Sequence, residues 1–137
     1  MKKIIGILML LFCVLNGFAQ TTKTSATAKV YFLRLSSISG ILVPFTVNDG
    51  SRKLCTIYDN QYVIRGVTAG NHEFFVDDGN KHISKKNKFT TEAGKTYYFL
   101  IRMVQGSYNG VTIDQTNEIY AKAKMGPMKE STGIVKK

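Results

Sequence analysis

The sequence predicts an all-β fold, an antiparallel β-sandwich of about seven strands with one short C-terminal helix. The first observation is a series of turn signals rich in Gly, Asn, Asp and Thr, most of them roughly 8–12 residues apart, which is typical of sandwiches. These signals lie at 48–50, 58–60, 68–70, 78–80 and 93–95. The second observation is that the segments between them are rich in β-branched and aromatic residues. We therefore expect a single all-β domain over residues 28–125.

The strongest strand signal is the segment 94–104, which follows a glycine turn. Its odd positions are apolar or aromatic: Tyr97, Phe99, Ile101 and Met103. Side chains alternate between the two faces of a strand, so these four share one face, which we expect to be the core face. Its even positions are Tyr98, Leu100, Arg102 and Val104. Because this second face is also mostly apolar, we expect the strand to be central in its sheet and partly covered on the outside.

The remaining strands follow from the same pattern. They are expected at 28–35, 41–48, 52–57, 61–67, 71–77 and 89–92, with a short last strand at 111–114. Pro44 cannot donate a ladder hydrogen bond, so its strand should lie at a sheet edge or carry a bulge.

Residues 116–125 form the only expected helix. Thr116 can cap its N-terminus, and Gly126 followed by Pro127 would end it. A strand through 118–122 is the alternative. The ending, 126–137, is expected to be a loose basic tail.

The N-terminus has the pattern of a secretory signal peptide. A positive start at Lys2 and Lys3 is followed by an apolar run and by small residues up to Ala19. We expect cleavage after Ala19, a flexible lead-in over 20–27, and a periplasmic, outer-membrane-associated or extracellular location. Cys13 lies inside the apolar run after Phe12, which argues against a lipoprotein signal. No later segment is apolar enough to cross a membrane.

The net charge and the number of cysteines indicate which partners and which covalent cross-links to expect. The 137-residue chain has a net charge of +10 and two cysteines, of which only Cys55 would remain after cleavage. We therefore expect no internal disulfide. An exported protein this basic is suited to anionic envelope components or to another envelope protein. Nucleic acid is not an expected partner.

Several segments resemble a known family. They are 28–34, 43–47, 67–74 and 92–99, of which the stretch Gly-Lys-Thr-Tyr-Tyr at 94–98 is the most specific. Together they resemble the bacterial family called domain of unknown function 2846, over about residues 27–124. The resemblance implies a β-sandwich and export, and it brings no catalytic residues. This sequence departs from the lipid-anchored members of that family because it lacks an acylation cysteine.

The residues that could carry chemistry are few. Cys55 lies near Arg52 and Lys53, but nothing in the sequence places His72 or His82 beside it as a base. The two histidines are ten positions apart and could hold zinc together with Glu73 or Asp77, although zinc sites usually have tighter spacing and more ligands. We expect Cys55 to be a core thiol and His72 a packed histidine that uses one ring nitrogen in a hydrogen bond. No enzyme activity, metal or cofactor is predicted.

One basic stretch is a candidate binding surface. Its lysines are Lys81, Lys85, Lys86 and Lys88. Placed on one hairpin, they could contact an anionic surface ligand such as lipopolysaccharide or an acidic glycan. The alternative is that they are solvated side chains that protect a strand edge from unwanted pairing. The predicted function is that of an exported, non-enzymatic structural or interaction module, with the anionic-ligand module as the alternative.

Overall fold

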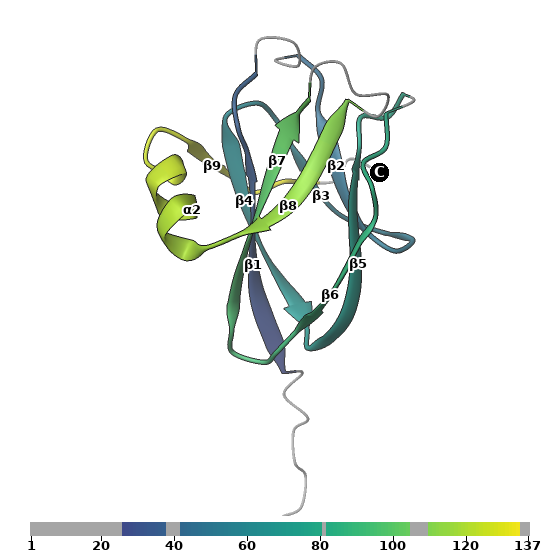
Figure 1. Cartoon of the computed structure of the whole chain (residues 1–137), viewed down its shortest axis with the longest axis vertical. Coiled ribbons are helices and arrows are strands. Elements are labelled where there is room, and N and C mark those ends of the chain that lie inside the picture. Colours follow the sequence, from purple (N-terminus) through teal and green to yellow (C-terminus); the bar gives the residue numbers. More distant parts are fainter. Residues whose placement is uncertain (1–25, 38–41, 81, 105–109, 135–137) are drawn as a thin grey trace, which may run out of the picture.

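The chain folds into two β-sheets packed face to face (Figure 1). The structure is a computed structural model that describes residues 26–37, 42–80, 82–104 and 110–134. A five-stranded sheet has the order β8-β7-β1-β4-β9, and a four-stranded sheet has the order β3-β2-β5-β6. The strands are β1 Thr27–Arg34, β2 Phe45–Asp49, β3 Arg52–Ile57, β4 Gln61–Thr68, β5 Gly70–Asp77, β6 Asn87–Thr91, β7 Thr96–Met103, β8 Val111–Thr116 and β9 Lys129–Ser131. The predicted signal peptide, 1–19, lies outside the described residues.

The all-β sandwich is confirmed, but it has more strands than the expected seven and its larger sheet is mixed. The described residues form nine strands. β1 pairs in parallel with β7, and β4 pairs in parallel with β9. The chain leaves the five-stranded sheet after β4, builds part of the other sheet, and returns at β7 beside β1. Such a return can place strands in parallel, whereas turn signals between neighbours in sequence indicate only antiparallel hairpins.

Strand β7 is the central strand that its sequence predicted. It lies between β1 and β8. Phe99 and Ile101 are buried between the two sheets, and Tyr98 and Leu100 are buried on the outer face. Both faces of β7 are therefore covered, one by the other sheet and one by a helix.

Four phenylalanine rings occupy the middle of the sandwich. Phe74 lies at their centre, with ring centroids 4.4 Å from Phe89, 5.2 Å from Phe32 and 5.3 Å from Phe99. All three contacts are edge-to-face, which suits the charge distribution of aromatic rings. This cluster joins β1 and β7 of one sheet to β5 and β6 of the other.

A buried arginine closes one end of the core. Arg34 is the last residue of β1, and its side chain is only 1% exposed. Its guanidinium donates to the carbonyl oxygens of Val43 and Ile57, the latter at 3.1 Å, and lies 3.9 Å from the ring centroid of Phe45. Burial lowers the pKa of Arg34, and the carboxylate of Asp59 opposes that shift. The side chain thus ties β1 to the entry of β2 and the end of β3.

Helix α2, Glu118–Met125, confirms the helical interpretation of this segment. Its cap is Asn117, whose side chain accepts a hydrogen bond from the backbone N–H of Tyr120 at 2.8 Å, rather than the expected Thr116. Ala121 is fully buried in a cluster with Leu33, Tyr98 and Leu100. The helix therefore covers the outer face of the five-stranded sheet (Figure 1). Within the described ranges, no helix is long and apolar enough to cross a membrane.

Strand β2 begins immediately after Pro44, so the proline takes no place in the ladder. The pairing with β3 does shift between Val47 and Asn48, but this bulge lies away from Pro44 and is not the one expected from the proline. The alternative of an edge position is wrong, since β2 lies between β3 and β5.

The expectation of a loose tail over 126–137 is wrong for its first half. Lys129–Ser131 form β9 beside β4, and the carbonyl of Gly133 accepts a hydrogen bond from the backbone N–H of Thr56 at 3.2 Å. Arg65 donates to the carbonyls of Leu54 and Gly133 at 3.0 and 2.9 Å. The C-terminal segment thereby bridges the edges of β4 and β3. Sequence patterns did not indicate this because β9 is short and pairs with a strand 68 residues away.

Gly133→Ala is expected to loosen this segment and to destabilise the fold by about 2 kcal/mol, because core overpacking typically costs 1–3 kcal/mol. An added Cβ would lie 2.8 Å from Val63 Cγ1 and 2.9 Å from Cys55 Cβ, at a residue with φ +57°. Urea unfolding measures the loss, and the rate of modification of Cys55 by a thiol reagent reports whether the segment has lifted.

The matched control is Gly94→Ala. Gly94 also has a positive φ of +76°, but an added Cβ would meet nothing within 4 Å. This variant isolates the backbone cost, about 1 kcal/mol. Equal losses for the two variants, with Cys55 equally slow to react, would show that close packing of Gly133 is unimportant.

Candidate functional site

The outer face of the four-stranded sheet carries many polar side chains and has no helix over it among the described residues. α2 covers the outer face of the five-stranded sheet, whereas no helix or strand of the described residues packs over the outer side of β2, β5 and β6 (Figure 1). We call this surface the open face. Its residues are Thr46, Asn48, Lys53, Thr56, Asn71, Glu73, Phe75, Asp77, Lys86, Lys88 and Thr90.

Strand alternation selects these residues. On β5, His72, Phe74 and Val76 are buried toward the core, so the residues between them point outward. Glu73 is opposite Lys88 in the β5–β6 ladder. Asp77 accepts a hydrogen bond from the Asn48 amide at 2.6 Å. The open face is thus built on rigid strands, with its polar groups at fixed positions.

The same alternation divides the four lysines that the sequence analysis grouped together. Lys86 and Lys88 belong to the open face, and the Nζ atom of Lys86 lies 3.4 Å from Glu73 Oε1 and 5.1 Å from the ring centroid of Phe75. Lys85 instead lines a small hollow with Thr112 and Asp114 of β8. Lys81 lies outside the described residues. The prediction of one common lysine surface therefore applies to only two of the described lysines.

The bulge in the β2–β3 pair adds a lysine that the sequence analysis did not select. Strict alternation from the buried Cys55 would place Lys53 on the core side. The register shift instead pairs Lys53 with Asn48, and Lys53 is exposed. Bulges commonly redirect a side chain in this way. No residue type in this hairpin indicates where the bulge lies, so only the structure reveals Lys53 as part of the open face.

Two hollows adjoin the open face. One, of about 620 Å³, is lined by Asn71, Glu73, Lys88 and Thr90 of the open face together with Asp49, Gly50, His72 and Phe89. The other, of about 460 Å³, is lined by Thr46, Lys53, Thr56 and Tyr58 on one side and by residues of the C-terminal segment 131–134 on the other. Each hollow therefore combines at least one hydroxyl group with one lysine.

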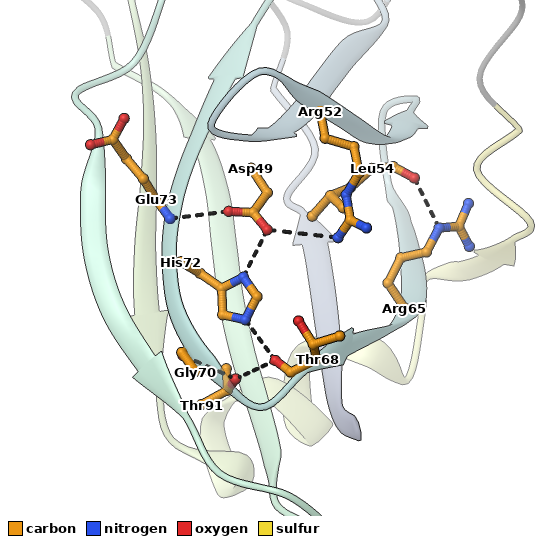
Figure 2. Close-up of polar contacts among 9 residues, drawn as sticks. All are labelled: Asp49, Arg52, Leu54, Arg65, Thr68, Gly70, His72, Glu73 and Thr91. Atoms are coloured by element: carbon orange, nitrogen blue, oxygen red, sulfur yellow. Dashed lines mark hydrogen bonds and ion pairs between the residues drawn. The ribbon is translucent and has the colours of Figure 1, made fainter. Parts of the chain in front are cut away.

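Asp49 and His72, which are in contact with each other (Figure 2), are among the residues that line the larger hollow. His72 Nδ1 lies 2.7 Å from Asp49 Oδ2, and His72 Nε2 lies 2.8 Å from the carbonyl oxygen of Thr68. The other oxygen of Asp49 accepts from the backbone N–H of Glu73 at 3.1 Å, and Arg52 lies 3.7 Å from Oδ2. The His72 side chain is packed as expected, but both of its ring nitrogens contact protein oxygens, rather than only one.

These contacts restrict what His72 can do chemically. Each ring nitrogen of His72 already lies at hydrogen-bond distance from a protein oxygen, so neither is directed toward an open position for a metal or a substrate. His82 lies in the loop between β5 and β6, where its Nδ1 contacts Asp78 Oδ2 at 2.7 Å. In the part of the chain that the structure describes, no three His, Cys, Asp or Glu residues are grouped so that they could hold a metal ion.

Cys55 is a buried core thiol. Its side chain lies beneath Gly133 and beside Val63. Burial raises the pKa of Cys55 to about 12, and nearby Arg65 opposes the shift. Because the thiolate is the nucleophilic form, a thiol with this pKa is unreactive near neutral pH.

In comparisons with protein-family models, with curated proteins and with solved structures, nothing matches this chain. The resemblance to domain of unknown function 2846 therefore stays a prediction, and the site must be interpreted from its own geometry.

Proposed function

We propose that the chain is an exported bacterial protein that acts as a non-enzymatic structural or interaction module of the cell envelope. The observation that carries this proposal is the contrast between its reactive and its exposed polar groups. The imidazole of His72 and the thiol of Cys55 are committed to internal contacts. Most polar side chains of the open face, in contrast, reach solvent from paired strands. This arrangement suits binding better than nucleophilic or acid–base catalysis.

Export is the part of the proposal that can be tested directly. When the full chain with a C-terminal tag is expressed in a Gram-negative host, the mature protein should begin at Gln20 and be found in the periplasmic, outer-membrane or extracellular fraction. Ala19→Arg should block cleavage, because the signal peptidase needs a small residue there. N-terminal sequencing of the fractions checks both. A wild-type product that keeps Met1 and stays in the cytoplasm would refute export.

A second candidate function is binding of an anionic surface ligand. The observation that favours it is that Lys86 and Lys88 face the same way and that Lys88 lines the larger hollow. Contacts between exposed charges weaken as salt screens them, so the binding should fall with ionic strength. Pull-down of the mature protein from envelope extract at low and high salt tests this, and equal capture at both would count against charge-based binding.

A further inference from the structure

We propose that the open face binds an acidic polysaccharide as an extended chain that runs across the strands from the larger hollow to the smaller one. Lys88 and Lys53 would contact acidic groups at the two ends of this path. The proposal rests on the second candidate function and specifies its ligand class and contact residues. It adds Lys53 and excludes Lys85 from the surface predicted from the sequence.

The charges of the open face leave its cations available to an acidic ligand. Glu73 is already paired with Lys86, and Asp77 is held by Asn48 and by the backbone N–H of Gly79. Neither Lys53 nor Lys88 takes part in an ion pair with any described residue. The ring of Phe75 helps to hold Lys86 at the centre of the face, because a cation is attracted to an aromatic face.

The spacing of the strands sets the length of the ligand. Lys53 is on β3 and Lys88 is on β6, the two edge strands of the four-stranded sheet. With adjacent strands about 4.8 Å apart, these edges are roughly 14 Å apart. A single sugar ring in one hollow could not reach both lysines. A polymer lying across β2 and β5 could contact both.

The other side chains suit a hydroxyl-rich ligand. Thr46 and Thr56 line the smaller hollow, and Asn71 and Thr90 line the larger one. Hydroxyl and amide groups can both donate and accept hydrogen bonds, as sugar hydroxyls require. Among the described residues that define the open face, Phe75 is the only large apolar side chain, and the smaller hollow adds Pro44, Tyr58 and Ile134 at one end. The centres of protein–protein interfaces are more apolar than this and are depleted in charge, so a hydrated polysaccharide fits better than a protein partner.

The test uses the mature protein, with alginate as the acidic probe and dextran as the neutral one, in affinity gel electrophoresis at low salt. Alginate should retard the protein and dextran should not. The double variant Lys53→Gln/Lys88→Gln should bind alginate about tenfold more weakly, a loss equivalent to about 1.4 kcal/mol. The matched control is Lys124→Gln/Lys129→Gln, which removes the same charge from exposed positions on α2 and β9. It should bind within twofold of wild type. Thermal unfolding checks that all variants are folded.

Several results would overturn the proposal. Equal retardation by dextran would show that acidic groups are not recognised, and an equal loss in the control variant would show attraction by net charge alone. Competition by uronate monomers as effective as that by long alginate oligomers would exclude an extended site. Binding to anionic lipid vesicles but not to alginate would assign the face to lipid. None of these results touches the cleavage at Ala19, so export is judged separately.

Discussion

Replacing Phe74 with alanine is expected to lower the free energy of unfolding by about 4 kcal/mol, within the range for buried Phe-to-Ala substitutions. Phe74 is 0% exposed and contacts Phe32, Phe89 and Phe99, and the His72 ring lies 5.5 Å away. Its removal would leave a cavity where four strands from both sheets meet. The midpoint and slope of urea unfolding, followed by circular dichroism, measure the loss.

Its neighbour in sequence provides the matched control. Phe75 points to the open face and is only partly buried. Phe75→Ala should therefore cost about 1 kcal/mol, since less apolar area is removed from water at this position. If the two variants were destabilised equally, the assignment of β5 faces would be wrong, and with it the composition of the open face.

Arg34→Met is expected to destabilise the protein by about 3 kcal/mol. Methionine fills much of the same space but cannot donate to the carbonyls of Val43 and Ile57. A buried polar group left without a partner typically costs about 1–3 kcal/mol. The contact between the guanidinium and the ring of Phe45 would also be lost. Urea unfolding again gives the change in stability.

Arg102→Met is the control for this substitution. Arg102 forms an ion pair with Asp114 at 2.8 Å, but its side chain is 51% exposed. Exposed ion pairs contribute about 0–1 kcal/mol, so this variant should remain close to wild type. A loss at Arg34 no greater than that at Arg102 would mean that the buried guanidinium does not hold the end of the sandwich together.

Much of the fold could be predicted because its determinants are local. The alternation of Phe99 and Ile101 with Tyr98 and Leu100 identified β7 as a strand covered on both faces, and the structure confirms it. The turn signals at 48–50 and 58–60 also predicted correctly that β3 begins at Arg52 and ends at Ile57. In each case the pattern depends on neighbouring residues, which is where periodicity and turn chemistry carry information.

The features that escaped prediction depend on contacts between distant parts of the chain. β9 pairs with β4 across 68 residues, and the parallel β1–β7 pair depends on the route of the chain through the other sheet. The candidate site shows the same limit. Lys86 and Lys88 could be chosen from the sequence, but it is a bulge that turns Lys53 toward the same face of the sheet. His72 contacts Asp49, 23 residues away, through one ring nitrogen and the carbonyl of Thr68 through the other.

The placement of β9 has a consequence for how the molecule tolerates truncation. β9 pairs along the edge of β4 that faces away from β1, and the carbonyl of Gly133 accepts a hydrogen bond from the backbone N–H of Thr56 on β3. A chain cut before Lys129 would expose hydrogen-bonding groups on both strands. An unpaired strand edge is a template for joining other chains. Such a fragment would be prone to intermolecular sheet formation even with the rest of its core intact.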